Sequence, residues 1–222
     1  MVTKLTWSVG VFVAVSACAG CAHPPAVSPG EQLYRTSRAR QHAFEQRLIQ
    51  EAFGPETPLP RGSERRRMVV SDPYMMMAPV GVEVLRGADR RVLIRFGVRG
   101  TSTPYSAAAP SAWTRATAGD ALLFRPPPPY RPPPPVTSPP PPPPPICHGF
   151  IMRFERADAS GARFDSAAQC GLPEAAVLNY AVDLAALGLE SRPACGTAGP
   201  SGSSVLFQLV RCFSGPRIAP PQ

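Results

Sequence analysis

The chain has 222 residues, of which 44% are hydrophobic and 17% are charged, and its formal net charge is +8. That length permits one domain with a real core or two small ones. A basic balance can indicate nucleic-acid binding, but the arginines are spread along the chain and only Arg65, Arg66 and Arg67 form a run, so we expect no nucleic-acid partner.

The first 17 residues have the pattern of an export signal. Lys4 supplies a positive charge, and Leu5 to Ser16 is an uncharged, mostly apolar run. The run is too short to cross a bilayer, which takes about 20 apolar residues, whereas about 7–15 suffice for the apolar part of a signal. A short buried helix is the alternative, but the run begins near the start of the chain and ends in small residues, which favours a signal.

The run ends in Val15-Ser16-Ala17-Cys18, which resembles the lipobox of bacterial lipoprotein precursors: an aliphatic residue, two small residues and a cysteine. The resemblance covers residues 1–21 only. It implies a diacylglyceryl group on the Cys18 sulfur, cleavage before Cys18 and acylation of the new amino terminus. Ala19, rather than Asp, after the cysteine implies the outer membrane, facing the periplasm. The expected address is therefore the cell envelope, with the membrane as a partner through the lipid anchor.

Cys21 is the alternative lipid acceptor, although the residue three places before it is Cys18 instead of an aliphatic one. Cys18 and Cys21 also form a C-x-x-C pattern, which is typical of redox and metal sites. We disfavour that interpretation because cleavage is expected at this point. Residues 18–30 then form a proline-rich, lipidated tether.

The remaining cysteines predict disulfides. Cys147, Cys170, Cys195 and Cys212 lie in the final third of the chain, and an even set in an exported chain favours two bonds. Three connectivities are possible. We prefer Cys147–Cys170, at the open end of a predicted hairpin, together with Cys195–Cys212.

Two elements are expected before the proline-rich region. Residues 31–53 lack Gly and Pro and place Phe44, Leu48 and Ala52 on one stripe, which predicts an amphipathic helix. Residues 56–67 are interpreted as a polar connector. Within residues 78–125, alternating valines on either side of Gly87-Ala88-Asp89 predict a β-hairpin. Residues 101–119 are expected to be a loop, and residues 121–124 a short strand.

Residues 126–145 hold 15 of the 31 prolines, and no helix or sheet interior tolerates that density. We expect a polyproline II spacer or projecting loop; a docking ligand is the alternative, because Pro127-Pro128-Pro129-Tyr130 matches a P-P-x-Y pattern. Residues 146–217 predict two strands, a helix opening at Pro173 and stopping near Gly188, and a final strand over residues 205–212. Residues 218–222 form a tail.

The predicted fold class is α+β, with an N-terminal helix, a β-hairpin, the proline-rich spacer and a disulfide-bonded ββαβ module. No catalytic motif is present. Cys147 and His148 are adjacent and would point to opposite faces of a strand. The consecutive Met75, Met76 and Met77 cannot all converge on one copper ion from an extended chain, so apolar packing is expected.

We therefore expect no catalytic residue, no metal and no cofactor, and a structural or binding role in the envelope. The basic balance favours a soluble surface or, as a sharper hypothesis, contact with an anionic envelope polymer or lipid headgroups. A protein partner is also open. The alternatives are an envelope enzyme whose site forms only in the fold, and a metal- or ligand-carrying lipoprotein.

Overall fold

The computed structural model describes residues 27–72, 77–124, 131–132, 149–161, 163–168, 175–195 and 202–214. The export signal, both candidate lipidation sites, nearly all of the polyproline segment and the tail lie outside these residues. So do Met75, Met76, Cys147, His148 and Cys170. Within the described part, no helix combines the length and apolar character needed to cross a bilayer.

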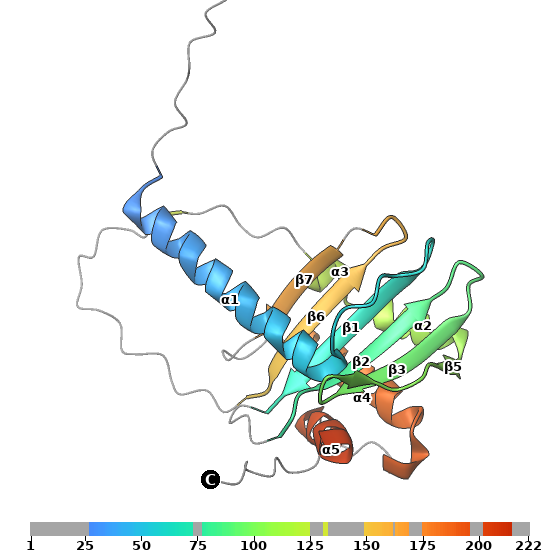
Figure 1. The fold of residues 1–222 in the computed structure, drawn as a ribbon. Coiled ribbons are helices and arrows are strands. Elements are labelled where there is room, and N and C mark those ends of the chain that lie inside the picture. Colours follow the sequence, from blue (N-terminus) through green and yellow to red (C-terminus); the bar gives the residue numbers. More distant parts are fainter. Residues whose placement is uncertain are drawn as a thin grey trace, which may run out of the picture.

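One antiparallel sheet organises this part of the chain (Figure 1). Its strand order is β4-β3-β2-β1-β6-β7, and β5 also pairs with β3. Because β1 pairs with β2 on one side and with β6 on the other, strands from before and after the polyproline segment share one sheet. That segment therefore connects two elements of the same unit. In chain order the strands are β1 (Glu64–Ser71), β2 (Val80–Arg86), β3 (Val92–Val98), β4 (Thr101–Ser102), β5 (Ser106–Ala108), β6 (Ile151–Ala157) and β7 (Arg163–Ala168).

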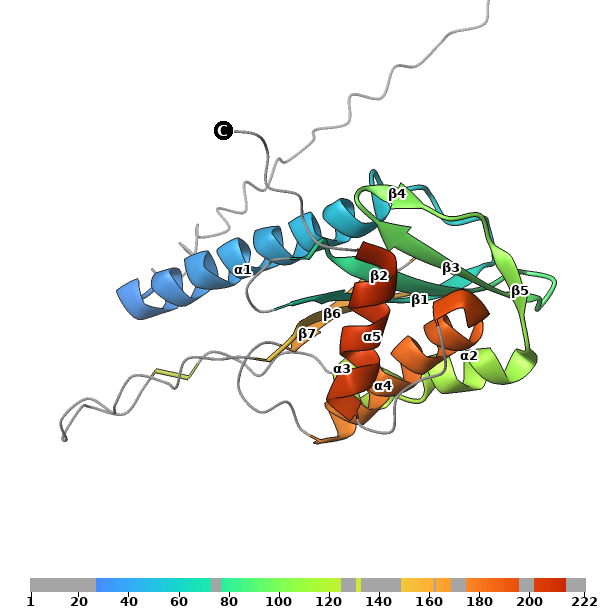
Figure 2. The ribbon, with the colours of Figure 1, turned by 90° about the horizontal axis from the view of Figure 1, so that it is seen from below.

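Helices cover both faces of the sheet (Figure 2). The helix α1 (Pro29–Phe53) crosses one face, and the opposite face carries α2 (Pro110–Thr117), α3 (Asp120–Leu123), α4 (Ala175–Glu190) and α5 (Gly202–Ser214). A short 3₁₀ helix, η1 (Pro193–Cys195), precedes α5. The larger hydrophobic core lies between the sheet and α2, α4 and α5, and a smaller one lies under α1. The predicted α+β class is confirmed.

The predicted hairpin is confirmed as β2 and β3, which pair from Val80↔Val98 to Arg86↔Val92. The turn closes with the Gly87 N–H donating to the Arg91 carbonyl at 2.9 Å. Every residue of β2 except Arg86 is buried, because helices cover the sheet on both sides.

The predicted final strand over residues 205–212 is wrong, because these residues lie in α5. Val205, Leu206, Leu209 and Val210 are buried, whereas Phe207 is 47% exposed. Positions i, i+1, i+4 and i+5 share one side of a helix but fall on both faces of a strand. The expected ββαβ order is thus replaced by β6, β7, α4 and α5.

Three further expectations are corrected. The expected connector over residues 56–67 ends in β1, the central strand, whose arginines are buried in ion pairs. The expected loop over residues 101–119 contains β4, β5 and α2, and Pro110 opens α2 while Trp113 packs into the core. The expected strand over residues 121–124 is replaced by the helical turn α3, which ends at Leu123 and begins at Asp120, a partner of Arg66 in β1.

The helix expected after Pro173 is described from Ala175 to Glu190 and does not stop at Gly188. A Cβ atom at Gly188 would lie 3.1 Å from both Phe96 and Val82 of the sheet. The glycine therefore lets α4 approach the sheet closely, and this packing role explains its place inside a helix.

The expected N-terminal helix over residues 31–53 is present and begins two residues earlier. Ser28 caps it by accepting a hydrogen bond from the Glu31 N–H at 3.2 Å, and Gly54, with φ of 78°, follows its last residue. Its C-terminal half buries the predicted stripe against Val69 of β1. The last side chain, Phe53, lies over Gly81 and Gly97, where added Cβ atoms would come within 2.1 and 2.4 Å of the ring.

The close approach of Phe53 to the sheet makes a testable prediction. Gly97→Ala should displace the ring and lower the free energy of unfolding by about 1–3 kcal/mol, as overpacking does. Chemical denaturation measures the effect. In a Phe53→Ala background the same substitution should cost much less, because the clash is gone. An equal cost in both backgrounds would contradict this account of α1 docking.

Candidate functional site: the charged face of the sheet

A row of alternating charges crosses the face of the sheet that α1 covers. The strand register places Arg95 of β3, Glu83 of β2, Arg67 of β1 and Glu155 of β6 side by side. Directly opposed residues of antiparallel strands point to the same face, so their side chains meet. Each cation in this row has a carboxylate as its neighbour.

The centre of the row is Glu83, which is 0% exposed. Its Oε2 accepts from Arg67 Nε at 2.8 Å and Nη2 at 2.5 Å, and its Oε1 accepts from Arg95 Nε at 2.7 Å. The Tyr105 hydroxyl also donates to Oε1. Arg67 reaches the next carboxylate as well, with Nη1 at 3.3 Å from Glu155 Oε2. The two carboxylates are therefore bridged by one guanidinium.

Arg65 links this row to the segment that follows α1. It lies two residues before Arg67 on the same face of β1 and is 1% exposed. Its Nη2 donates to Glu155 and, at 2.8 Å, to Oε1 of Glu56 in the connector. The connector is thus tied to the centre of the sheet by an ion pair between buried Arg65 and the more exposed Glu56.

The helix α1 is held by a second ion pair and by an aromatic ring. Arg153 Nη1 of β6 donates to Glu45 Oε2 at 2.5 Å, and Gln41 Nε2 donates to the other oxygen of Glu45 at 2.6 Å. The Phe53 ring lies 4.3 Å from the Arg67 guanidinium carbon, a cation–π distance. Both the middle and the end of α1 therefore depend on charged side chains of the sheet.

These interactions fix the protonation states of the cluster. Burial by itself would raise the pKa of Glu83, but Arg67, Arg95 and Arg65 outweigh it, so the pKa lies below its usual value. Burial would lower the pKa of Arg65, yet Glu155 and Glu83 hold it above the usual value. Burial, reinforced by Glu83, raises the pKa of Tyr105. Glu83 is therefore ionised and Tyr105 neutral near pH 7, and neither is poised for general acid–base catalysis.

The opposite face of the sheet holds a related cluster at the start of β1. Arg66 pairs with both carboxylate oxygens of Asp120, at 2.9 Å from Nε and 2.6 Å from Nη2. Its guanidinium carbon lies 5.0 Å from the Trp113 ring, and that of Arg86 lies 4.6 Å from it. These contacts fasten α2 and α3 to the inner strands β1 and β2. All three members of the Arg65–Arg67 run are thus buried structural residues.

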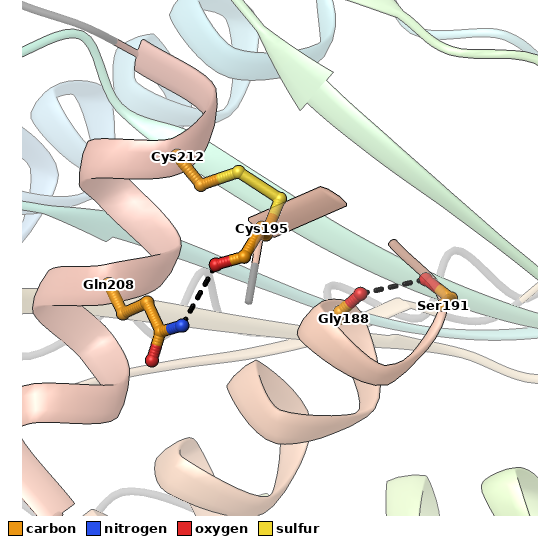
Figure 3. Close-up of a disulfide and its surroundings, with 5 residues drawn as sticks. All are labelled: Gly188, Ser191, Cys195, Gln208 and Cys212. Atoms are coloured by element: carbon orange, nitrogen blue, oxygen red, sulfur yellow. Dashed lines mark hydrogen bonds between the residues drawn. A yellow bond between two sulfur atoms is a disulfide. The ribbon is translucent and has the colours of Figure 1, made fainter. Parts of the chain in front are cut away.

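The predicted disulfide between Cys195 and Cys212 is confirmed (Figure 3). It joins η1 to α5, and Gln208 Nε2 of α5 donates to the Cys195 carbonyl at 2.9 Å beside it. The other predicted disulfide, Cys147–Cys170, and the lipidation candidates lie outside the described residues. Of the three methionines, Met77 is described and packs against the larger core. Among the described residues, no group of three or more His, Cys, Asp or Glu side chains could hold a metal ion.

Sequence reasoning missed the charge cluster because its members are distant in the chain. The available signal was Glu64-Arg65-Arg66-Arg67 running into Met68-Val69-Val70, a charged stretch continuous with a strand-like one.

Comparisons with protein-family models, with curated proteins and with solved structures found no match for this chain. The charged face of the sheet consists of paired charges that hold α1 and the connector on the strands.

The disulfide should contribute measurably to stability. A bond that spans 17 residues restricts the unfolded chain, so replacing both Cys195 and Cys212 with serine should lower the free energy of unfolding by about 3 kcal/mol. Urea denaturation of the oxidised proteins measures this loss. Adding a reductant to the double variant is the control, since any further loss reports on the predicted Cys147–Cys170 bond. A double variant as stable as the wild type would show that the disulfide does not contribute to the free energy of unfolding.

Glu83→Gln should lower the free energy of unfolding at pH 7 by about 3–5 kcal/mol, because it removes the buried carboxylate that Arg67 and Arg95 share and leaves Arg67 with its longer contact to Glu155. The matched control is Glu190→Gln, whose exposed pair with Arg115 should contribute less than about 1 kcal/mol.

The same carboxylate makes stability depend on pH. Since its pKa is lower in the folded state, its contribution is complete above the unfolded pKa of about 4.3 and is lost as pH falls through the folded value. Denaturation midpoints below pH 4 should therefore converge for wild type and Glu83→Gln. A constant difference between them down to pH 2 would contradict the lowered pKa.

Proposed function

We propose that this chain is a lipid-anchored protein of the bacterial cell envelope, attached through Cys18 at the outer membrane and facing the periplasm, with a non-catalytic structural or binding role. The observation that carries the proposal is Val15-Ser16-Ala17-Cys18 at the end of an uncharged apolar run. A thioether-linked diacylglyceryl group together with an acylated amino terminus supplies the two or more lipid signals that stable anchoring requires.

The disulfide supports the exported address. Cys195 and Cys212 are joined, and structural disulfides persist in oxidising compartments such as the periplasm while they are rare in the cytosol. The bond secures α5, which contributes Leu206, Leu209 and Val210 to the larger core. A domain built in this way suits a compartment in which thiols are oxidised.

The charged face of the sheet supports a binding or scaffolding role over catalysis. Its carboxylates are engaged by guanidiniums, and its one phenol, Tyr105, has a raised pKa. A nucleophile or general base needs a group that exchanges protons near neutral pH. The ion pairs of the cluster instead hold α1 and the connector after it on the sheet.

The partner of the domain is proposed to be an envelope component, either a protein or an anionic polymer. The precursor carries +8, and removal of residues 1–17 with Lys4 leaves 22 arginines against 15 acidic residues, or +7. Many of the described arginines are engaged in ion pairs, so the basic surface available to a partner is smaller than the net charge suggests.

The anchor is tested in bacterial cells that express the full chain. We expect radiolabelled palmitate to enter the wild type and Cys21→Ser, and both should fractionate with membranes. Cys18→Ser should lose the label and accumulate as a soluble or uncleaved form. Globomycin, which inhibits the lipoprotein signal peptidase, should leave a lipidated precursor. An unmodified mature protein that begins at Met1, or a Cys18→Ser variant that keeps the label, would overturn the proposal.

A further inference from the structure

The first half of α1 extends beyond the sheet and is solvent-exposed in the described structure (Figure 1). From Gln32 to Arg40 every residue is exposed, whereas burial against the domain is concentrated from Glu45 onward. We name residues 29–43 the projecting half of α1. An isolated helix of this length is marginal in water, so its persistence calls for local stabilisation or an external surface.

Local interactions account for part of that stability. The Ser28 cap is followed by the pair Glu31–Arg35 at 2.6 Å, four residues apart. Arg38 Nη1 donates to the Tyr34 hydroxyl at 3.2 Å, and its guanidinium carbon lies 5.9 Å from that ring. These contacts are exposed and each contributes little. They stabilise the helix over residues that are mostly exposed in the described structure.

The composition of the projecting half is that of a helix at a membrane surface. Arg35, Arg38 and Arg40 outnumber Glu31, which already pairs with Arg35. Apolar side chains are exposed at the helix start as well. Of the five large apolar residues that are exposed in the described part of the chain, Leu33 at 72% and Tyr34 lie in the projecting half, and Val27 lies two residues before it.

A helix with basic residues and exposed apolar and tyrosine side chains suits the headgroup region of a membrane. There arginine binds lipid phosphates and tyrosine lies at the membrane–water interface. One side of the projecting half combines Leu33 and Arg40 with uncharged polar side chains, and Tyr34, Arg35 and Arg38 lie on other sides of the helix. Residues three, four, seven, eight and eleven places apart share that side and line a shallow groove, namely Pro29, Gln32, Leu33, Thr36, Ser37 and Arg40. Arginine, amide and hydroxyl groups are the donors that phosphate oxygens accept from.

The proposed anchor determines what this surface can reach. Ser28 lies ten positions after Cys18, and ten extended residues span no more than about 35 Å. A lipid on Cys18 would therefore keep the start of α1 near the headgroups at high effective concentration. Under these conditions even a weak attraction suffices to hold the helix against the membrane.

We infer that the projecting half of α1 binds anionic phospholipid headgroups and lies against the membrane that carries the anchor. The inference rests on the proposed lipid attachment at Cys18. It assigns to α1 two contacts, with the bilayer through residues 29–43 and with the sheet through its C-terminal half. The domain is then held at a defined position beside the membrane instead of swinging on a tether.

Vesicle co-sedimentation tests the surface without the lipid. The probe is the chain from residue 18 onward with Cys18→Ser, mixed with phosphatidylcholine vesicles that contain 30% phosphatidylglycerol or none. We expect binding to the anionic vesicles only, and its weakening at high salt. Arg35→Gln, Arg38→Gln and Arg40→Gln combined should reduce the affinity by at least about 25-fold, since a basic residue at such a surface contributes about five-fold.

The matched control combines Arg61→Gln, Arg90→Gln and Arg91→Gln, which removes the same charge from exposed positions near the β2–β3 turn. It should bind like the parent chain, and circular dichroism should confirm that both triple variants keep their helices. Equal losses in both triple variants would overturn the inference in favour of net charge alone. The inference would also be overturned if the chain did not bind anionic vesicles. It would be overturned as well if the substitutions changed only dimer formation through α1.

The two proposals fail separately. Absence of palmitate from the protein in cells would remove the anchor whatever the vesicles show. If palmitate is incorporated but the chain does not bind vesicles, the proposed anchor stands and the proposed contact of α1 with the membrane fails.

Discussion

The salt bridge that Arg67 forms with Glu83 and Glu155 is the constraint on which this architecture depends. Three neighbouring strands, β2, β1 and β6, each contribute one charged side chain to it, and all three side chains are at least nine-tenths buried. Removing such ions from water costs several kcal/mol each, so they are tolerated only when paired with good geometry and further hydrogen bonds. Arg65, Arg95 and Tyr105 supply those bonds. The central strand can therefore lie inside the protein although it begins with Glu64-Arg65-Arg66-Arg67.

The two faces of the sheet accordingly pack by different means. On one face, branched and aromatic side chains such as Val82, Ile94 and Phe96 meet α4 and α5 in an apolar core. On the other, the smaller core of α1 covers only part of the surface, and ion pairs fill the rest. Hydrophobic burial is non-directional, whereas an ion pair fixes which groups meet. The register of α1 on the sheet is set by Glu45 on Arg153 and by Phe53 in the space that Gly81 and Gly97 leave open.

The parts of this fold that the sequence predicts are those whose burial is apolar and local. The β2–β3 hairpin follows from alternating valines around a turn, and α1 from the stripe Phe44, Leu48 and Ala52. The central strand β1 escapes prediction because its arginines are neutralised by Glu83 and Glu155, which lie 16 and 88 residues away from Arg67. The helix α5 was assigned as a strand because a short apolar run does not by itself distinguish the two. Only the disulfide pairing of Cys195 and Cys212 was anticipated among the site features within the described residues.

These observations bear on how an anchored domain would sit at a membrane. A helix held to its domain by apolar burial alone could detach from the domain and expose an apolar surface to lipid. Here undocking of α1 would also break the ion pair between Glu45 and Arg153 and the contact of the Phe53 ring with Arg67, so release loses specific electrostatic contacts in addition to apolar burial. The projecting half and the docked half of α1 belong to one continuous helix from Pro29 to Phe53. Whatever orients the first half at a surface is therefore transmitted rigidly to the sheet, and the ion pairs under α1 make that orientation a property of the whole domain.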